Sequence, residues 1–343
     1  MDNSILRKDI HDFANHFELA EEYRNSTFLI TGATGLIGSI LIKCLAELNS
    51  RFNLRINIIS IIRDLQKARI VFEDEYQDIE FIQIPISEIS NENIQRDIDY
   101  IIHLASPTAS KFFITNPVET LSSAFMGTKA VLNFAKMNNV RGVVYASSLE
   151  VYGSNHTDDL INEDFQGYVN PIDVRSSYSL GKRVCECLCR SYAEEYQVPV
   201  LIARLTQTFG AGVKDSENRV FAQFPRSILS RQNIELHTEG SSAKPYCYTL
   251  DAVSAILYLL LRGKKGEAYN IANKGSYISI RDMALFLKKN FNPEIDVVVN
   301  VKEGMGYAPE TRLRLDTRKI ESLGWKPHYD LEQMFRRLIE YMK

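Results

Sequence analysis

The sequence has no long apolar run and no marked excess of charge of either sign. No apolar stretch approaches the roughly 18–20 residues that are needed to cross a bilayer. The first twenty residues carry charges throughout and lack the apolar centre of a signal peptide. Lys and Arg number 40 against 43 for Asp and Glu, which gives a net charge of −3. We therefore expect a cytoplasmic protein with neither a membrane partner nor a nucleic-acid partner.

Cysteine is also scarce, and its spacing does not suit a metal. Three of the five cysteines follow the pattern Cys185-x-Cys187-x-Cys189, and the other two are Cys44 and Cys247. Structural metal sites usually combine C-x₂₋₄-C with a second pair elsewhere in the chain, and this sequence has no such second pair. We therefore expect no metal, and we expect the thiols to be buried and reduced.

The remaining composition is that of an ordinary globular protein. The chain has 343 residues, of which 45% are hydrophobic and 24% charged. This length is sufficient for a sizeable core without disulfide bridges or metals. It predicts one large domain or two closely packed domains.

Short apolar runs alternate with helical patterns over the first two thirds of the chain. The runs are apolar throughout, as expected for strands of a parallel sheet that helices cover on both faces. This pattern predicts an α/β fold with a Rossmann-type, doubly wound parallel sheet. The predicted strands are 27–31, 56–62, 81–84, 100–105, 143–147 and 200–205, and the main helices are 36–48, 118–137 and 178–196.

The rest of the chain predicts a helical extension and a smaller α/β domain for the substrate. Residues 1–20 form an amphipathic helix with Ile5, Ile10, Phe13, Phe17 and Leu19 as its apolar positions. Residues 310–341 are expected to be mostly helical. The predicted division is an extension at 1–25, a dinucleotide-binding domain at 26–205 with a return segment at about 246–274, and a substrate domain at 206–245 and 275–343.

A glycine-rich turn joins the first predicted strand to the first long helix. In Gly32-x-x-Gly35-x-x-Gly38, the first glycine permits a tight turn and the second lets backbone N–H groups approach a pyrophosphate. The third glycine lets the helix pack against the strand. Thr34, Leu36 and Ile37 lie within the same turn, where the positive end of the helix dipole faces the phosphates. The pattern predicts a bound dinucleotide.

The end of the second predicted strand indicates which dinucleotide binds. That strand ends in Arg63, which is followed by Asp64. An arginine at this place suits the 2′-phosphate of NADP, whereas a carboxylate suits the ribose hydroxyls of NAD. Alternatively, Arg63 stacks on the adenine and Asp64 takes the ribose. We predict NADP or NAD as cofactor, with a small preference for NADP.

Tyr178 and Lys182 lie one helical turn apart on the same helix face. A tyrosine titrates near 10, so it is a poor base at neutral pH. A nearby ammonium is expected to lower its pKa and make it useful for acid–base catalysis. Lys182 can also hold the ribose of the nicotinamide. Ser148 ends another predicted strand and can hydrogen-bond the reacting oxygen beside Tyr178.

These motifs resemble those of extended short-chain dehydrogenases/reductases, in the NAD-dependent epimerase/dehydratase family that acts on nucleotide sugars. The resemblance extends from about residue 28 to 326, and the stretch 148–183 is most similar to UDP-glucuronate decarboxylases. It implies that Ser148, Tyr178 and Lys182 move hydride between a sugar C4 and the nicotinamide. It also implies cofactor contacts at Leu104 and Ala105 and a substrate contact at Ser106.

Several positions relate this chain to particular reactions of the family. Glu150 matches a carboxylate that assists substrate chemistry in decarboxylases and dehydratases, but Leu149 stands where dehydratases carry an acid. Lys244 stands where the family usually has an arginine that meets the diphosphate or assists decarboxylation, and Lys lacks the bidentate fork. Gln207 replaces a usual asparagine at a substrate contact. Arg312, or alternatively Arg314, is expected to contact the diphosphate.

Together these positions lead to a specific hypothesis with open alternatives. We expect reduction of the C4 keto group of a dTDP-4-keto-6-deoxyhexose, in the biosynthesis of surface polysaccharide. The alternatives are a UDP-glucuronate decarboxylase or 4-epimerase that recycles its NAD, and a catalytically silent nucleotide-sugar binder. Relatives often pair through two helices each, so we expect a homodimer that forms through the helices at 118–137 and 178–196.

Overall fold

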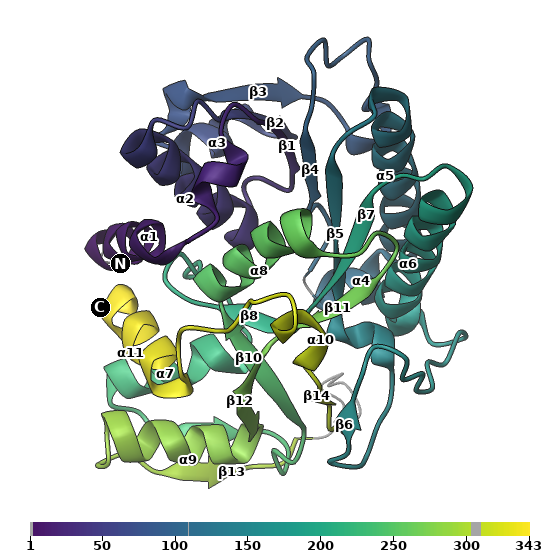
Figure 1. The fold of residues 1–343 in the computed structure, drawn as a ribbon. Helices are drawn as coiled ribbons and strands as arrows, with labels where there is room; N and C mark the ends of the chain where they lie inside the picture. The colour runs from purple at the N-terminus through teal and green to yellow at the C-terminus, as the bar shows by residue number, and fades with distance from the viewer. Residues whose placement is uncertain (1–2, 109, 303–309) are drawn as a thin grey trace.

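A large parallel sheet organises the molecule (Figure 1). The computed structural model describes residues 3–108, 110–302 and 310–343. Within them, seven strands pair in the order β11-β7-β5-β4-β1-β2-β3, and every neighbouring pair is parallel. The predicted α/β class and parallel sheet are thereby confirmed. The strands are β1 (Thr27–Thr31), β2 (Asn57–Ile62), β3 (Ile79–Gln83), β4 (Tyr100–His103), β5 (Gly142–Ser148), β7 (Val200–Leu205) and β11 (Ala268–Ile271).

Helices cover both faces of this sheet, which explains why its strands are apolar on both sides. On one face, α2 (Leu36–Phe52) and α8 (Thr249–Arg262) pack in one apolar cluster. On the other face, α5 (Pro117–Asn138) and α6 (Ser177–Glu195) pack in a second cluster. All three predicted long helices are present, within a few residues of their predicted bounds. Two short helices, α3 (Leu65–Val71) and α4 (Ser110–Thr115), lie in the connections.

The order of the strands reverses between β1 and β4. From β1 the chain moves outward to β2 and β3, then returns to place β4 on the other side of β1. Thr31 and His103 are register partners at the ends of these two strands. Such a reversal opens a crevice at the carboxyl ends of the strands, where ligands of this class of sheet bind. The glycine turn and residues 104–106 follow strands at this edge, and Ser148 is the last residue of β5 there.

A smaller lobe lies beside this edge of the sheet (Figure 1). Its centre is a three-stranded sheet in which β10 (Ala243–Tyr248) lies between β8 (Gln207–Phe209) and β12 (Asn273–Ser279). Two further strand pairs are β9 (Ile234–Leu236) with β13 (Val297–Val299), and β6 (Leu160–Ile161) with β14 (Arg314–Leu315). The helices of this part are α7 (Val220–Ser230), α9 (Ile280–Phe291) and α11 (Leu331–Met342).

The C-terminal segment differs from the prediction that residues 310–341 are mostly helical. Only α10 (Arg318–Glu321) and α11 are helical there, and β14 precedes them. Gly324 has a φ of +99°, a left-handed conformation that ends α10. Trp325 is then buried with its indole N–H on Ser254 Oγ at 2.8 Å, and Pro327 follows in the non-helical stretch. Burial of this one tryptophan overrides the local helical pattern.

The predicted N-terminal helix is shorter in the structure. Helix α1 covers Asn3–His16, and the first two residues of the predicted helix lie outside the described part of the chain. Phe17 is buried beyond its end. Asp9 on α1 is 1% exposed, and its carboxylate bonds with Tyr248 of β10 and Arg337 of α11. The extension is therefore joined to the smaller lobe by a buried ionic contact.

The helices and the thiols bear on two expectations that came from composition. Among the described residues, no helix combines the length and apolarity that a membrane span requires. All five cysteines are free thiols, and four of them are buried as expected. Cys187 is the exception, because it lies on the outward side of α6 and is exposed.

Candidate active site

The glycine turn after β1 packs so closely against neighbouring backbone that two of its glycines leave no room for a side chain. Gly32 has a φ of +74°, and a Cβ at this position would lie 2.7 Å from the backbone nitrogen of Ala105. A Cβ on Gly38 would collide with the carbonyl oxygen of Gly32. Gly35 is the N-cap of α2, and no side chain caps the N–H groups of that helix in the described chain. These N–H groups, from Leu36 onward, are free to bind a pyrophosphate.

A buried hydrogen-bond relay links the carboxyl ends of β1 and β4. Thr31 Oγ1 lies 2.7 Å from His103 Nδ1, and His103 Nε2 lies 3.2 Å from Thr128 Oγ1. The backbone N–H of Ala105 donates to Thr31 Oγ1 at 3.3 Å. Burial, together with the nearby charge of Lys182, lowers the pKa of His103 to about 3, so the imidazole is neutral. The relay holds Leu104 and Ala105 directly against the glycine turn.

Cations gather where the adenine ribose of a dinucleotide binds in this fold. Arg63 follows β2 and is exposed. Asp64 caps α3 by accepting a hydrogen bond from the backbone N–H of Lys67 at 3.0 Å. Burial lowers the pKa of Lys67, and the nearby Lys214 and Arg63 lower it further. The sequence did not predict Lys67 or Lys214 as cofactor contacts. Lys214 lies far along the chain, in the loop after β8, and only the fold places it near Lys67 and Arg63.

Tyr178, Lys182 and Ser148 come together between α6 and the end of β5. Ser148 ends β5, and its side chain hydrogen-bonds Tyr178. Lys182 is buried, and its ammonium donates to the carbonyl oxygen of Ala146 at 2.6 Å. The same ammonium lies 5.8 Å from the centre of the Tyr178 ring and 4.8 Å from that of Tyr145. The structure thus brings the three residues together, and their catalytic roles stay a prediction.

The pKa of Tyr178 differs from the expectation that Lys182 lowers it. Burial raises the pKa of Tyr178 above its ordinary value, and the Glu150 carboxylate raises it further. The Ser148 hydrogen bond and Arg219 oppose this rise. Burial also lowers the pKa of Lys182 to about 8. Burial therefore disfavours both the phenolate of Tyr178 and the ammonium of Lys182, and this effect outweighs the attraction between the two charges. Tyr178 is thus a neutral phenol that can donate a proton.

Glu150 is held in the site by several groups. Ser179 donates to Glu150 Oε2 at 3.2 Å, and Arg175 Nη1 lies 3.6 Å from the same oxygen. The backbone N–H of Glu150 donates to Ser148 Oγ at 3.2 Å. Leu149, between the two, is buried and apolar. Arg175 lies in the stretch 148–183 that resembles UDP-glucuronate decarboxylases. Its contact with Glu150 is what indicates a role for it in the site.

Further cations reach the site from the smaller lobe. Lys244 on β10 is half-buried, and burial lowers its pKa. Glu150 opposes that effect, while Arg175 and Arg219 add to it, so the four groups share one electrostatic environment. Arg219 was not predicted as a site residue. It precedes α7 and forms an ion pair with Glu217 at 2.5 Å.

Two of the three remaining predicted substrate contacts, Gln207 and Arg312, lie beside β10, the strand that carries Lys244. Gln207 lies on β8, opposite Tyr246 of β10. Arg312 bridges to the start of β10, and its guanidinium pairs with Asp158 at 2.5 Å. Ser106 is half-buried, and its hydroxyl donates to the carbonyl oxygen of Pro107 at 3.2 Å.

A metal-binding cluster or a cavity elsewhere in the molecule would be the alternatives to this site. Among the residues that the structure describes, no group of His, Cys, Asp or Glu could hold a metal ion. A cavity of about 840 Å³ lies at the opposite, amino edge of the sheet, where Thr27, Asn57 and Ile79 line it. It contains none of the predicted catalytic residues, so the chemistry belongs to the carboxyl edge.

Comparison with known proteins agrees with this geometry. The model of the NAD dependent epimerase/dehydratase family matches residues 28–272. UDP-glucuronic acid decarboxylase 5 of Arabidopsis thaliana is 31% identical over 322 residues, which cover 90% of this chain and 87% of the relative. UDP-glucuronic acid decarboxylase 1 of Danio rerio is 28% identical over 322 residues, which cover 91% and 72%.

Solved structures show the same fold. UDP-glucose 4-epimerase of Thermotoga maritima superimposes with a TM-score of 0.76 at 19% identity, over 92% of this chain and 98% of that one. UDP-glucuronic acid 4-epimerase from Bacillus cereus, in complex with NAD, gives a TM-score of 0.74 at 21% identity over the same shares. The family match covers well over half of the chain and coincides with the glycine turn and the Ser148–Tyr178–Lys182 site. This chain therefore belongs to the NAD-dependent epimerase/dehydratase family, and is an enzyme of the short-chain dehydrogenase/reductase type.

Proposed function

We propose that this enzyme binds a nucleoside-diphosphate sugar across the crevice and moves hydride between the sugar C4 and a nicotinamide. Tyr178 exchanges the proton of the C4 oxygen, Ser148 hydrogen-bonds that oxygen, and Lys182 holds the nicotinamide ribose. The nicotinamide supplies the hydride acceptor or donor. The meeting of these three side chains beside the glycine turn supports this proposal, as do relatives whose names describe UDP-sugar enzymes.

The substrate that the site suits best is a UDP-linked hexuronate, and the reaction is its decarboxylation. The cluster of Arg175, Arg219 and Lys244 around Glu150 carries this proposal. Oxidation at C4 gives a β-keto acid, in which the bond from C5 to the carboxylate breaks and CO₂ leaves. The electron pair stays on C5 and the C4 oxygen until C5 is protonated and the hydride returns. Cations suit a carboxylate substituent, whereas the methyl group of a 6-deoxy sugar gains nothing from them.

Reduction of a dTDP-4-keto-6-deoxyhexose, which was the first hypothesis from the sequence, is the second candidate. Two observations favour it. Arg63, Lys67 and Lys214 suit the 2′-phosphate of NADPH, which is the usual reductant. Lys244 also lacks the bidentate fork of the arginine it replaces. With a buried Leu149 in place of an acid, elimination of water is not proposed. Roles in surface polysaccharide synthesis and in the cytoplasm stay predictions.

Two assays on the purified enzyme separate these candidates. UDP-glucuronate labelled with ¹³C at C6 should release labelled CO₂ and a UDP-pentose, with no net consumption of cofactor. A dTDP-4-keto-6-deoxyhexose with NADPH or NADH would instead give stoichiometric oxidation of the reduced cofactor. Tyr178→Phe should abolish whichever activity is found. Turnover of neither substrate, or activity that survives Tyr178→Phe, would contradict the proposal and favour a silent nucleotide-sugar binder.

We further propose that the enzyme is a homodimer and that NADP is preferred over NAD. Exposed apolar side chains on α5 and α6 support the dimer, because both helices cover the same face of the sheet. These side chains are Val118, Leu121, Phe125, Met126 and Val184. A patch of this kind marks a protein interface more often than free surface. The cations around Arg63 support NADP, whereas the family is described as NAD dependent and the Bacillus cereus epimerase structure contains NAD.

A further inference from the structure

Glu186 and Arg204 form a buried ion pair behind the proposed catalytic residues. Glu186 lies on α6 and Arg204 on β7, and they are 8% and 7% exposed. Arg204 Nη2 lies 2.7 Å from Glu186 Oε2, and Arg204 Nε lies 3.0 Å from Glu186 Oε1. The contact therefore has the bidentate geometry that makes an arginine–carboxylate pair strong and directional.

The other polar atoms of the pair also have partners. Ser147 Oγ donates to Glu186 Oε1 at 2.5 Å. Arg204 Nη1 donates to the hydroxyl of Tyr152 at 3.1 Å and to the carbonyl oxygen of Glu163 at 2.6 Å. A buried ion pair contributes little to stability compared with apolar packing, but removing one partner leaves a costly unpaired charge. We therefore look for its role in what it holds in place.

The pair connects the elements that carry the proposed catalytic side chains. Ser147 is the neighbour of Ser148 at the end of β5. Glu186 follows Lys182 by one helical turn, so both lie on the same face of α6. Tyr152 ends the 3₁₀ helix Leu149–Tyr152, which contains Glu150. A movement of the ion pair would thus shift Ser148 relative to Lys182.

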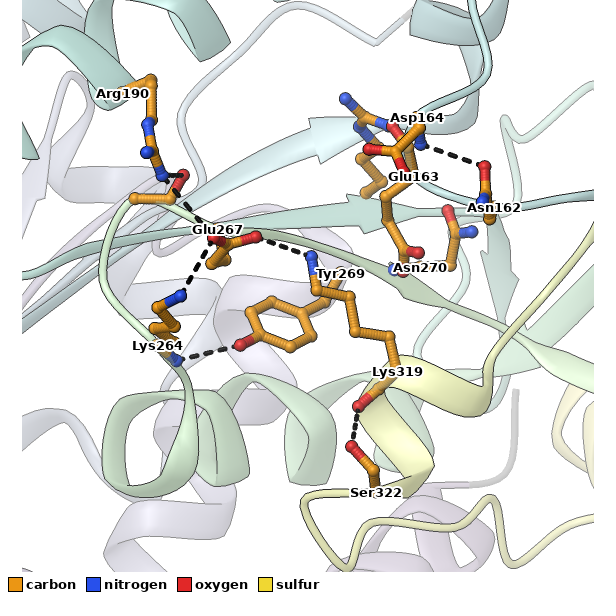
Figure 2. A network of polar contacts seen from close by, with 12 residues as sticks. Asn162, Glu163, Asp164, Arg190, Lys264, Glu267, Tyr269, Asn270, Lys319 and Ser322 are labelled. Carbon is orange, nitrogen blue, oxygen red and sulfur yellow. Dashed lines mark hydrogen bonds and ion pairs between the residues drawn. The ribbon is translucent and has the colours of Figure 1, made fainter.

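The network continues through Asn270 of β11, which Figure 2 shows beside Glu163, to the segment that follows β14. The Tyr152 hydroxyl donates to Asn270 Oδ1 at 2.5 Å, and the backbone N–H of Asn270 donates to Glu163 Oε1 at 2.8 Å. Asn270 Nδ2 donates to the carbonyl oxygen of Asp316 at 3.0 Å, directly after β14. Arg312 precedes the same strand. One connected network therefore joins β5, α6 and the strand beside a proposed substrate contact.

Glu186 is also the carboxylate that acts on the charge of Lys182. Burial is the main cause of the lowered pKa of Lys182, and Glu186 opposes it, as do two cysteines of α6. From β4, the neutral His103 faces Lys182, and from β5 the ring of Tyr145 does. The groups around the ammonium are Cys185, Glu186 and Cys189 on α6, His103 on β4, Tyr145 on β5 and Tyr178 at the start of α6.

A cavity of about 330 Å³ gives solvent access to this ion pair. Glu186 and Arg204 line it together with Arg183, Arg190 and Glu267. Glu267 lies between Arg190, at 3.6 Å, and Lys319, at 2.9 Å (Figure 2). Charges of both signs balance along this cavity, so it does not favour a charged ligand. It does provide a path by which a small cation can reach the position of the Arg204 side chain.

We propose that the Glu186–Arg204 pair is a positioning element, which holds Ser148 in place through Ser147 and fixes a carboxylate one helical turn from the Lys182 ammonium. This inference rests on the proposed catalytic roles of Ser148 and Lys182, but its first test does not need a substrate. The pair acts through other residues, so neither member touches the sugar.

The first test measures the titration of Lys182 directly. Protein labelled with ¹³C at lysine Cε is titrated by NMR, and the Lys182 signal is assigned by its loss in Lys182→Met. Glu186→Gln keeps the shape and the acceptor oxygen but removes the charge, so the pKa of Lys182 should fall by about one unit. Glu194→Gln, an exposed change on the same helix, should leave it unchanged. An unchanged Lys182 pKa in Glu186→Gln would overturn the electrostatic role, whatever the substrate is.

The second test uses the cavity for chemical rescue. Arg204→Ala should lower kcat about 100-fold with little change in KM, because a displaced Ser148 no longer meets the reacting oxygen. Guanidinium ion at millimolar concentration should enter the cavity and restore much of kcat. Arg190→Ala, on the rim of the same cavity, should keep normal kcat and show no response to guanidinium. Guanidinium that restores the melting temperature but not kcat would show a merely structural role.

If Arg204→Ala does not fold, the isosteric Glu186→Gln decides the question. In this variant the alkaline limb of the pH–kcat profile should move down with the Lys182 pKa. A profile that does not follow the NMR titration would contradict the positioning role. Absence of turnover in the wild-type enzyme with a normal Lys182 response to Glu186→Gln would instead count against the proposed substrate alone.

Discussion

Phe113 stacks face to face on Tyr178, with ring centres 4.3 Å apart and planes 10° from parallel. Phe113 lies on α4 and is 1% exposed. The hydroxyl of Ser177, next to Tyr178, donates to the carbonyl oxygen of Phe113 at 3.2 Å. The segment after β4 therefore fixes the start of α6 through its backbone and the Tyr178 ring through its side chain. The orientation of the Tyr178 hydroxyl toward Ser148 depends on this stacking contact with Phe113.

Loss of the Phe113 ring should impair catalysis more than stability. Phe113→Leu keeps apolar volume but removes the flat surface, so the Tyr178 hydroxyl should lose its fixed direction. We expect kcat to fall about 10- to 100-fold, because small displacements of a reacting group have effects of this size. The cost in stability should be about 1–2 kcal/mol. Phe113→Tyr, which keeps the ring, should retain kcat, and equal losses in both variants would contradict the stacking role.

The neutral state of His103 predicts how stability depends on pH. Its pKa of about 3 in the folded protein lies below the ordinary value of 6.5. Between these values the unfolded chain binds a proton that the folded protein does not, so stability falls as pH falls through this window. The contribution approaches about 1.4 kcal/mol per pH unit. Below pH of about 3 both states are protonated and the slope disappears.

The measurement compares His103→Gln with the wild type by urea unfolding between pH 4 and about 6.5. His103→Gln should be less stable at neutral pH, because Thr31 and Thr128 lose a fitted partner. The difference between the two proteins should shrink as pH falls. His156→Gln removes an exposed histidine and should leave the slope unchanged. A constant difference across the window would show that His103 is not buried neutral.

The sequence predicted the parts of the site that depend on local spacing. The glycine turn, Ser148 and the Tyr178–Lys182 pair belong to short motifs, and strands of a parallel sheet bring their ends to one edge. The electrostatics of the site required three dimensions. Arg175 and Arg219 were not predicted as site residues, and only the fold reveals that they share one electrostatic environment with Glu150 and Lys244.

The predictions that the structure contradicts failed because they, too, depended on three-dimensional surroundings. The helical spacing of Tyr178 and Lys182 suggested that the pKa of Tyr178 is lowered. That prediction ignored burial, which is the main cause of the raised pKa of Tyr178 in the structure. The segment 310–341 has helical composition, yet burial of Trp325 and the left-handed Gly324 divide it. In both cases a tertiary effect exceeded a local tendency. Cys187 faces outward from α6, and residue type alone could not predict that this one cysteine is exposed.

The cations near Arg63 should determine the choice between NADP and NAD. Arg63→Ser removes one charge from the group that includes Lys67 and Lys214. Each lost contact of a charged group with the 2′-phosphate costs about 1.5 kcal/mol, so the Kd for NADP should rise about tenfold. The Kd for NAD should change little, because NAD lacks that phosphate. Binding is measured by calorimetry with each dinucleotide.

Arg69 provides the matched control for this change. It is an exposed arginine on α3, and its guanidinium contacts Tyr76 at 3.4 Å. Arg69→Ser should leave both dissociation constants unchanged. If Arg63→Ser weakens NAD and NADP equally, Arg63 stacks on the adenine instead, and the preference for NADP has no support from this residue.

The apolar surface of α5 and α6 should be the dimer interface. Phe125 on α5 is 37% exposed and Val118, two turns earlier on the same helix, is 76% exposed. Phe125→Glu would bury an unpaired carboxylate in this interface, at a cost of several kcal/mol. We expect the Kd of the dimer to rise more than about 100-fold, which sedimentation velocity detects as a monomer at micromolar concentration. Ile70→Glu on α3, where Ile70 is 79% exposed, should leave the dimer intact. A monomeric wild type, or a Phe125→Glu variant that remains dimeric, would exclude this surface as the interface.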